Sequence, residues 1–308
     1  MIISQPAIFS AKRKSTGTEA TSWTQRTSQF AGNYVAGGDF GNGVWVVVGN
    51  GGKLSTATDP TATWTARTSS FGASAIEEAH YGSDGYWVIV GVSGKLATAT
   101  DPTGTWTQRT SSFGADTIHH ASYDGTTYWV AVGDDGKLAT ATDPTGTWTQ
   151  RTSSFTASGI QYVTFGSDGY WVAVGDDGKL ATATDPTGTW TQRTSAHGSS
   201  RITSIDYGEG YWVASGNDGK LSTATDPTGT WTLRNIGFGG STTYEASYGN
   251  GAWTVVSSGG NLATALDPTG TWTARTSSFG ATTIFAVYYG TGGVWCAQGS
   301  TGKIATGV

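Results

Sequence analysis

Two dipeptides, Glu77-Glu78 and His119-His120, carry side chains that can do chemistry. Carboxylate and imidazole groups serve as metal ligands and as general acids and bases. The two pairs lie 42 residues apart, which makes them equivalent if the chain repeats with that period. Adjacent residues of a β-strand point to opposite faces, so we expect only one member of each pair to face a shared site. We therefore expect no metal centre and no cofactor.

Other features of the sequence exclude several classes of protein. Neither a Gly-rich phosphate loop before a helix nor a Ser/His/Asp arrangement stands out. The single cysteine, Cys296, excludes an internal disulfide and a cysteine-cluster metal site. The formal net charge of -5 gives no electrostatic footprint for nucleic acid. The longest apolar run, near residues 44–48, is too short for membrane insertion, and basic residues 12–14 follow the first apolar residues, the wrong order for a signal peptide.

A repeat of 41 or 42 residues organises the chain, because all fourteen tryptophans fall into two series with that spacing. The first series is Trp23, Trp64, Trp106, Trp148, Trp190, Trp231 and Trp272, and the second is Trp45, Trp87, Trp129, Trp171, Trp212, Trp253 and Trp295. Each unit has four short extended segments separated by Gly-rich or Asp-Pro-Thr-Gly turns, which favour hairpins. A sustained 3.6-residue apolar period is absent from the sequence, so we expect no helices.

Four strands in a unit of this length predict the blade of a β-propeller. The segment that begins at Trp171 is apolar on both faces, as required for a sheet packed between two neighbours. A linear β-solenoid is the alternative, but it would show shorter coils and dedicated caps. We predict an all-β, seven-bladed propeller at residues 21–308, with four antiparallel strands per blade, after an N-terminal extension at residues 1–20. The expected blades span about 31–68, 73–110, 115–152, 157–194, 199–235, 240–276, and 281–308 plus 21–28.

The chain ends predict how the ring closes. The last copy stops at Val308 after three strands, whereas Trp23–Arg26 precedes any innermost strand. An N-terminal outer strand that completes the C-terminal sheet removes its exposed edge. We interpret residues 1–20 as an extension that lies against the ring or docks to a partner.

An aspartate begins the turn before the outer strand of six units: Asp59, Asp101, Asp143, Asp185, Asp226 and Asp267. A carboxylate at a tight turn accepts backbone N–H groups, so we assign these residues a structural role. We expect the outer-strand Trp to pack between blades. The Arg three residues after that Trp is expected to stack on a neighbouring blade or pair with an Asp, and the Lys of each Gly-Lys-Leu to be solvated.

The turn resembles the Asp-box of BNR-repeat propellers, Ser-x-Asp-x-Gly-x-Thr-Trp, in the spacing of Asp101, Thr105 and Trp106. It departs from that pattern because Gly104 comes one place late, proline follows the aspartate, and Ala99 replaces the serine. The whole unit also looks like repeats of bacteriophage tail and virion proteins. This resemblance implies the fold and a virion setting, but a fold does not by itself determine an activity.

The resemblance also implies what an enzyme of this kind would need. Sialidases with Asp-boxes use an arginine triad, a tyrosine nucleophile and an acidic residue. Outside the repeated position this chain has only Arg13 and Arg201, so that triad cannot form. Other glycosidases need two carboxylates across a cleft, for which Glu78 and Asp206 are the candidates. We expect no enzyme.

The innermost strands differ most between copies, and they line the central channel of a propeller. The residues expected at the channel mouth are Glu78, His120, Tyr162, Ser204, Asp206 and Glu245. Two interpretations remain open: a wet channel that tolerates sequence drift, or an asymmetric binding funnel on a symmetric scaffold.

Three functions follow from these features. The first is a non-enzymatic interaction module of a phage virion or tail, with other virion proteins or a host-surface glycan as partners. The second is a multivalent lectin with sugars bound at repeated aromatic grooves, and the third is a glycoside hydrolase. We expect a virion location, or a cytoplasmic one if the chain is not from a phage.

Overall fold

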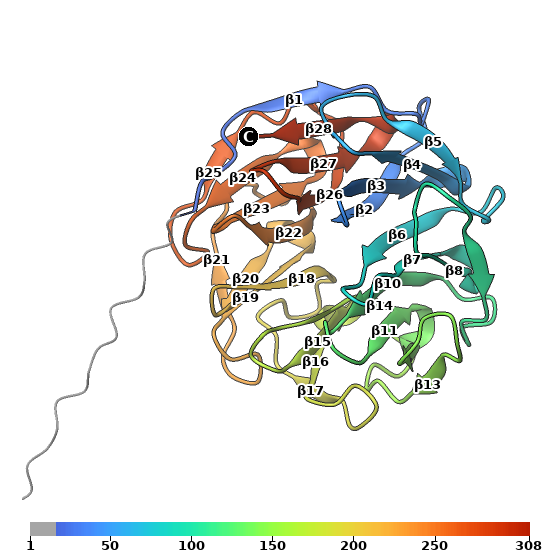
Figure 1. Ribbon diagram of the computed structural model, residues 1–308. Helices are drawn as coiled ribbons and strands as arrows, with labels where there is room; N and C mark the ends of the chain where they lie inside the picture. The colour runs from blue at the N-terminus through green and yellow to red at the C-terminus, as the bar shows by residue number, and fades with distance from the viewer. Residues whose placement is uncertain (1–16) are drawn as a thin grey trace, which may run out of the picture.

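Seven four-stranded sheets are arranged in a ring in the computed structural model, which describes residues 17–308 (Figure 1). Within each sheet the neighbouring strands are antiparallel, as in β10 to β13. No α-helix occurs between residues 17 and 308. These findings confirm the predicted all-β, seven-bladed propeller and exclude the solenoid.

We letter the strands of each blade A to D from the inside outward. The A strands are β2 (Val35–Gly41), β6 (Ile76–Tyr81), β10 (Ile118–Tyr123), β14 (Ile160–Phe165), β18 (Ile202–Gly208), β22 (Thr243–Gly249) and β26 (Ile284–Tyr289), which open blades 1 to 7. The B strands are β3 (Val44–Gly49), β7 (Trp87–Gly91), β11 (Trp129–Gly133), β15 (Trp171–Gly175), β19 (Tyr211–Gly216), β23 (Ala252–Ser257) and β27 (Trp295–Gly299).

The outer half of each blade is shorter. The C strands are β4 (Lys53–Ala57), β8 (Leu96–Ala99), β12 (Leu138–Ala141), β16 (Leu180–Ala183), β20 (Leu221–Ala224), β24 (Leu262–Ala265) and β28 (Ile304–Gly307). The D strands are β5 (Thr65–Thr68), β9 (Thr107–Arg109), β13 (Thr149–Arg151), β17 (Thr191–Arg193), β21 (Thr232–Arg234), β25 (Thr273–Arg275) and, for blade 7, β1 (Trp23–Arg26). Short 3-10 turns join B to C: η1 (Asn50–Gly52), η2 (Val92–Gly94), η3 (Asp134–Gly136), η4 (Asp176–Gly178), η5 (Asn217–Gly219), η6 (Ser258–Gly260) and η7 (Ser300–Gly302).

The ring closes through the N-terminal strand, as predicted. Strand β1 pairs antiparallel with β28, with Trp23 opposite Gly307 and Arg26 opposite Ile304. Figure 1 shows β1 along the outer side of β28, beside the C-terminus. The last blade is therefore built from both ends of the folded ring, and its outer strand β1 is joined to β28 by hydrogen bonds and side-chain packing, without a C–D turn.

The segment before β1 also contacts blade 6. The Thr18 N–H donates to the Asn250 carbonyl at 3.1 Å, and Glu19 forms a 2.7 Å ion pair with Arg275. Ala20 is buried. Of the expected extension, residues 1–16 lie outside the described residues, so its docking role stays a prediction.

Both faces of every sheet are buried against a neighbouring blade, which explains the continuous apolar runs of the B strands. In blade 2, Ile89 packs into the cluster shared with blade 1, whereas Val88 and Val90 pack against Trp129 of blade 3. The B-strand Trp also meets the aromatic residue at the end of its own A strand, as Tyr81 meets Trp87 at a ring separation of 5.1 Å. Large aromatic surfaces thus fill the wedges between blades.

The turn before each D strand is pinned by its aspartate. Oδ1 of Asp143 accepts hydrogen bonds from the Thr145 N–H at 2.8 Å and from the Thr145 hydroxyl at 2.7 Å. Trp148 is buried and donates its indole N–H to the Pro144 carbonyl at 3.2 Å. The same carboxylate contacts recur at Asp59, Asp101, Asp185, Asp226 and Asp267.

Two expectations about repeated basic residues are refined. The Arg109 Nε donates to the Thr98 hydroxyl of its own blade at 2.9 Å, which neither expected contact included. The expected proximity to an aspartate is seen at Asp226, whose pKa is lowered by hydrogen bonds from Thr228 and, secondly, by the charge of Arg193 in the preceding blade. The lysine is not simply solvated, because Lys95 Nζ donates to the Phe71 carbonyl at 2.8 Å. That carbonyl belongs to the loop between blades 1 and 2, so the lysine fastens the D–A loop to the C strand. The local sequence pattern around Lys95 could not predict this contact, because its two partners are 24 residues apart in the chain.

Candidate functional site

Each A strand begins with a β-bulge, which brings two consecutive side chains to the centre of the ring. In blade 3, Ile118 pairs with Gly133 and His120 with Val132, so His119 is the extra residue. A bulge re-aims the side chain of the extra residue. One member of each pair lines each cavity, as expected for a shared site, because Glu77 and His119 line one cavity whereas Glu78 and His120 line another. The second member of each pair does not point away from the axis, which strand alternation alone had implied.

The first cavity, which we call the mouth, has a volume of about 320 Å³. Its wall consists of Tyr34, Ala36, Glu77, His119, Gln161, Tyr244 and Phe285. Most of these residues lie at the beginning of the A strands, so the mouth is at the ring face that carries the D–A loops and the B–C turns. Tyr34 lies in a D–A loop, and the sequence analysis, which compared the innermost strands of the repeats, did not identify it.

The mouth has an aromatic side and a polar side. Phe285 of blade 7 makes edge contacts with Tyr34 and Tyr244, at ring separations of 5.8 and 5.1 Å. The polar side comes from blades 2 to 4, where His119 Nε2 lies 2.8 Å from Asp134 Oδ1 of η3. Burial raises the pKa of Glu77, and the nearby His119 opposes that change. The two halves therefore offer apolar contact and hydrogen bonding across one opening.

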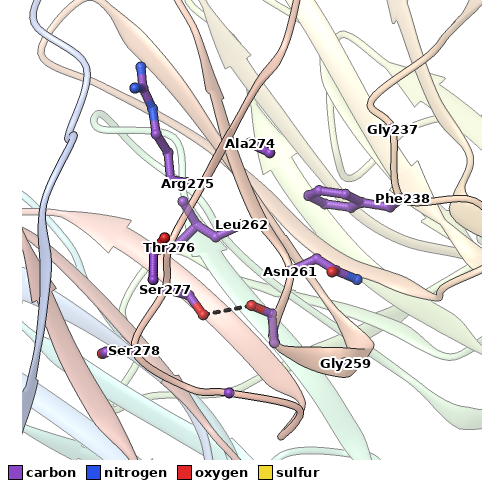
Figure 2. A pocket seen from close by; sticks show the side chains of 12 residues that line it. Gly237, Phe238, Gly259, Asn261, Leu262, Ala274, Arg275, Thr276, Ser277 and Ser278 are labelled. Atoms are coloured by element: carbon purple, nitrogen blue, oxygen red, sulfur yellow. Dashed lines mark hydrogen bonds between the residues drawn. The ribbon is translucent and has the colours of Figure 1, made fainter.

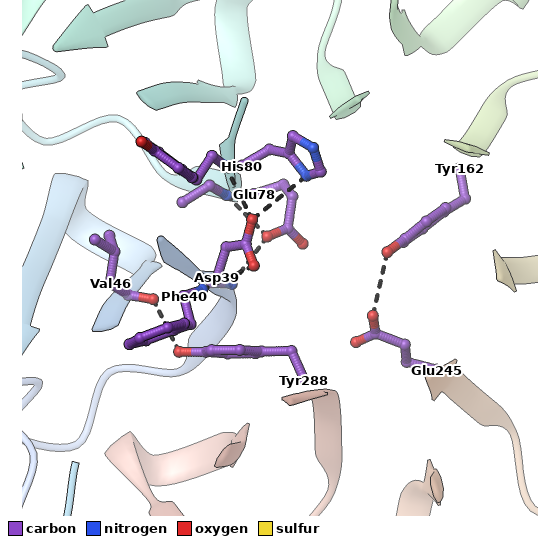
Figure 3. Close-up of polar contacts among 11 residues, drawn as sticks. Asp39, Phe40, Val46, Glu78, His80, Tyr162, Glu245 and Tyr288 are labelled. Atoms are coloured by element: carbon purple, nitrogen blue, oxygen red, sulfur yellow. Dashed lines mark hydrogen bonds and ion pairs between the residues drawn. The ribbon is translucent and has the colours of Figure 1, made fainter. Parts of the chain in front are cut away.

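The second cavity, about 210 Å³, lies farther along the A strands, and we call it the acidic chamber. Four carboxylates reach it from blades 1, 2, 5 and 6: Asp39, Glu78, Asp206 and Glu245. Figure 3 shows Asp39 and Glu78 together on one side of the central opening and Glu245 with Tyr162 on the opposite side. Histidines and tyrosines make up much of the remaining wall: His80, His120, Tyr162, Tyr248, Tyr288 and Tyr289.

The carboxylates of blades 1 and 2 bind the backbone of each other's A strand. Glu78 Oε1 accepts the Gly38 N–H at 2.9 Å, while Asp39 Oδ2 accepts the Tyr81 N–H at 2.9 Å. A strands form the inner edge of each sheet, so alternate N–H groups point to the centre without a strand partner. These side chains satisfy such donors and join one blade to the next.

The same device recurs on the other side of the ring. Asp206 Oδ2 accepts the Tyr248 N–H at 2.7 Å, and Glu245 Oε2 accepts the Val287 N–H at 2.9 Å. Ser204 Oγ accepts the Ala246 N–H at 3.1 Å. Several of the varied channel positions thus have a structural task that differs in chemistry from blade to blade.

Burial makes these carboxyl groups weak acids. It raises the pKa of Glu245 to about 8 and that of Asp206 to about 7, although each accepts backbone N–H groups that oppose the change. Burial and then the charge of Glu245 raise the pKa of Glu78 well above its usual range. Burial likewise raises the pKa of Asp39, against the effect of His80. A desolvated carboxylate without a cation favours the protonated form.

His120 and Tyr162 form a stacked pair in the chamber wall, with ring centroids 3.6 Å apart. The Tyr162 hydroxyl donates to Glu245 Oε1 at 3.2 Å. His120 is only 4% exposed, and its Nδ1 has no hydrogen-bond partner within residues 17–308. Burial, followed by the neighbouring His80, lowers the pKa of His120 well below its ordinary value. The His120 imidazole is therefore uncharged at neutral pH.

Five of the six residues expected at the channel mouth line the acidic chamber instead: Glu78, His120, Tyr162, Asp206 and Glu245. The sixth, Ser204, is buried beside the chamber and also contacts the Ser215 hydroxyl at 2.8 Å. Asp39, His80 and Tyr288 also line the chamber. They occupy the same position of the repeat as Asp206, one of the varied A-strand positions, but were not among the six candidate residues. Across the described ring, no three His, Cys, Asp or Glu side chains lie close enough together to hold a metal ion.

A third cavity, of about 380 Å³, lies away from the channel at blade 6 (Figure 2). It borders Phe238, Asn261 and Arg275, and Asn261 occupies the position of the repeated lysine. Figure 2 shows the Ser277 hydroxyl bonded to the backbone near Gly259, a 2.6 Å contact with the Gly260 carbonyl. Arg275, the one charged residue of this wall, already pairs with Glu19, so the channel is the stronger candidate site.

These features define the class of protein as a closed seven-bladed β-propeller with two cavities on its axis. No protein-family model matches the sequence, and no curated protein matches it. Within residues 17–308 there is also no helix of the length and apolarity needed to cross a bilayer.

Solved structures share the architecture. YCF48 from Cyanidioschyzon merolae has a TM-score of 0.74 and 15% identity, over 94% of this chain and 99% of that one. YCF48 bound to D1 peptide has a TM-score of 0.75 and 15% identity, over 94% and 96%. A catalytically inactive variant of virginiamycin B lyase from Staphylococcus aureus, with quinupristin, has a TM-score of 0.83 and 13% identity, over 92% and 98%. At this level of identity the likeness shows the fold alone.

Proposed function

We propose that the chain is a non-enzymatic interaction module whose mouth receives a segment of a partner protein. The observation that carries this proposal is the division of the mouth into an aromatic side and a polar side. Seven identical blades would give a uniform opening. Here blades 6, 7 and 1 contribute aromatic residues whereas blades 2 to 4 contribute polar ones, so equivalent positions carry different residue types. Apolar contact with a few placed polar groups is typical of a binding site.

The size of the mouth favours a short segment over a folded surface. A cavity of about 320 Å³ takes one or two side chains of an extended chain. Two propellers of the same architecture have been solved with bound ligands, YCF48 with a D1 peptide and inactive virginiamycin B lyase with quinupristin. They support the general idea that proteins of this fold can bind ligands, without assigning either ligand to this chain.

The contacts of two chamber carboxylates support a non-enzymatic function. Glu78 and Asp206, the candidate pair for glycoside hydrolysis, both accept backbone N–H groups of a neighbouring blade. Removing either group would leave buried donors unsatisfied, so their positions are explained by architecture. The setting that we propose is a bacteriophage tail or virion, with other virion proteins as partners; its support is the resemblance of the repeat unit. Detection of the chain in purified particles tests that setting.

The binding proposal is tested by selecting peptide ligands from a random library with the full chain. We expect bound peptides to share an apolar residue that enters the mouth, and Phe285→Ala or Tyr244→Ala to weaken binding about tenfold or more. Leu233→Gln is the matched control, because Leu233 is 48% exposed on the rim and the equivalent residue of blade 2 is Gln108. A selection that yields no ligand, or ligands indifferent to both mouth variants, would overturn the proposal.

A host-surface glycan is the second candidate ligand. The aromatic rings of Tyr244 and Phe285 beside Glu77 and Gln161 provide stacking and hydrogen bonding of the kind that sugars use. The repeated tryptophans cannot provide sugar platforms, because Trp64, Trp106 and their equivalents are buried. A lectin function would therefore be centred on a single mouth, and a glycan array with Phe285→Ala as the negative control separates it from peptide binding.

A further inference from the structure

We propose that the acidic chamber binds one organic cation, an ammonium or guanidinium group that enters between Glu78 and Glu245. This site is distinct from the mouth, and the inference goes beyond the proposed function. The group can come from a lysine or arginine side chain of a partner or from a free alkylamine. The shared chemistry is a positive charge with several N–H donors.

The first support is unbalanced charge. Four carboxyl groups line the chamber, and no lysine or arginine of the described ring lies in its wall. Isolated carboxylates in an apolar interior are strongly unfavourable, so they must be protonated or paired with a cation. A cation that enters the chamber therefore has a strong electrostatic advantage over a neutral ligand.

The second support is the unused hydrogen-bonding capacity of the wall. Glu78 accepts two backbone N–H groups through Oε1, from Gly38 at 2.9 Å and Ala79 at 2.8 Å. Its other oxygen, Oε2, lies beside Gly37, where an added Cβ would be only 2.3 Å away. His120 also lines the chamber, and its Nδ1 is buried without a hydrogen-bond partner among the described residues. A neutral imidazole nitrogen and a carboxylate oxygen can both accept N–H donors.

The third support is geometric and distinguishes an organic cation from a metal ion. The carboxylates reach the chamber from opposite sides of the ring, as Figure 3 shows for Glu78 and Glu245. In the part of the chain that the structure describes, they form no group compact enough for metal ligation. An ammonium or guanidinium group can bridge such separated acceptors, directly or through water. A cavity of about 210 Å³ exceeds the roughly 150 Å³ that suffices for benzene.

Binding must also be linked to protons. The titratable groups that face the chamber are Asp39 from β2, Glu78 and His80 from β6, His120 from β10, Tyr162 from β14, Asp206 from β18, Glu245 and Tyr248 from β22, and Tyr288 and Tyr289 from β26. Because burial raises the pKa of Asp206 to about 7 and that of Glu245 to about 8, these groups are partly protonated near neutral pH. A bound cation lowers these pKa values and releases protons, so affinity rises with pH across this range.

The experiment is calorimetric titration of the full chain with butylamine, with methylguanidinium and with a lysine-containing tetrapeptide. Butanol serves as the neutral counterpart. We expect the cations to bind with proton release, and butanol not to bind. Glu245→Gln and Glu78→Gln, each shown by circular dichroism and a cooperative unfolding transition to be folded at the pH of the titration, should weaken binding about tenfold or more. If one of them does not fold, the other still decides the result.

The matched control is Asp135→Asn, which makes the same carboxylate-to-amide change at an exposed B–C turn. Binding of free amines and of the peptide supports the chamber in general, whereas binding of the peptide alone identifies a partner side chain as the source. No cation binding, equal binding of butanol, or equal effects of Asp135→Asn and Glu245→Gln would each overturn the proposal. Phe285→Ala should leave amine binding unchanged, so failure here is distinguishable from failure at the mouth.

Discussion

The backbone N–H of Tyr248 donates a 2.7 Å hydrogen bond to the carboxylate of Asp206, which lies 42 residues earlier in the preceding blade. Asp39 receives the N–H of Tyr81 in the same way, at the same separation in sequence. These contacts connect the inner edges of adjacent sheets, where no further strand of the described ring is present. Polar residues on the axis therefore hold the ring together as well as shaping its cavities.

Asp206→Ala is expected to destabilise the protein because it leaves the buried Tyr248 N–H without its acceptor. The free energy of unfolding should fall by about 1–3 kcal/mol, as measured by urea denaturation. Asp206→Asn keeps an acceptor oxygen and should cost less. Ser122→Ala is the control, since Ser122 holds the same column in blade 3 but has no such inter-blade bond within the described ring. Equal losses at the two sites would contradict the assignment.

The acidic chamber should also make stability fall as pH rises. The pKa of Glu245 is about 8 in the folded chain against an ordinary value of 4.5. Its contribution to stability is therefore complete below about pH 4.5, decreases as pH rises, and is lost above about pH 8. Each unit of such a difference corresponds to about 1.4 kcal/mol. Glu245→Gln removes this ionisation and keeps an acceptor for the Val287 N–H, so its stability should vary less between about pH 5 and pH 9.

Urea titrations of the wild type and Glu245→Gln across that range provide the measurement. The Gln variant should be the more stable protein at the alkaline end and should differ little at the acidic end. Parallel curves would show that Glu245 ionises equally well in the folded and unfolded chain. Asp206, whose pKa is raised to about 7, contributes a remaining slope in the same direction.

His197 should produce the opposite dependence at acidic pH. It replaces the phenylalanine found at Phe113 in the equivalent D–A loop, is fully buried, and lies 3.1 Å from the Ser222 hydroxyl. Burial, and secondly the charge of Lys220, lower its pKa from 6.5 to about 4. The unfolded chain therefore binds a proton first, and up to about 3 kcal/mol of stability should be lost as pH falls from 6.5 toward 4.

His197→Phe is expected to remove that acid sensitivity. Blade 1 already has Phe30 and Ser55 at the same two positions, so a phenylalanine side chain fits beside a serine there. The double change His197→Phe with Ser222→Ala reproduces the Phe113 and Ala139 pair of blade 3. If acid unfolding of these variants follows the wild-type curve, protonation of His197 is not the cause.

The tryptophan spacing and the four extended segments of each unit predicted the ring, and the two chain ends predicted its closure. Trp23 without a preceding A strand, and Val308 without a following D strand, left one consistent pairing, which β1 and β28 make. Closure depends on strand count, and strand count is visible in a repeat. The burial of both faces of the B strands followed for the same reason, since Val88 and Ile89 are adjacent and both apolar.

The channel was predicted less completely because its residues depend on register and on contacts between blades. A single bulge at Ile118 and His120 decides whether one or two side chains reach the centre, and strand propensity does not specify it. Asp39 and Glu78 become partners only after the ring has placed blades 1 and 2 side by side. The contact of Lys95 was not predicted for a similar reason, because its carbonyl acceptor at Phe71 lies in the D–A loop before blade 2, 24 residues earlier in the chain.

Removing the closing strand should open the ring. A chain that lacks residues 1–26 loses β1, its ladder with β28 and the buried Trp23, leaving the outer edge of β28 unpaired. Unpaired edges promote aggregation, and losing a buried Trp side chain alone typically costs about 3–5 kcal/mol. We expect aggregation or a large drop in melting temperature, measured by light scattering and thermal unfolding.

A chain that lacks only residues 1–16 keeps every described contact, including the Glu19–Arg275 ion pair, and should melt like the full protein. Adding a synthetic peptide of residues 17–28 to the chain without β1 should restore stability, because the missing strand can then pair in trans with β28. A Trp23→Ala peptide should restore less, since it keeps the backbone ladder but not the apolar contact. A shortened chain that stays monomeric with an unchanged melting temperature would mean that β1 does not hold the ring closed.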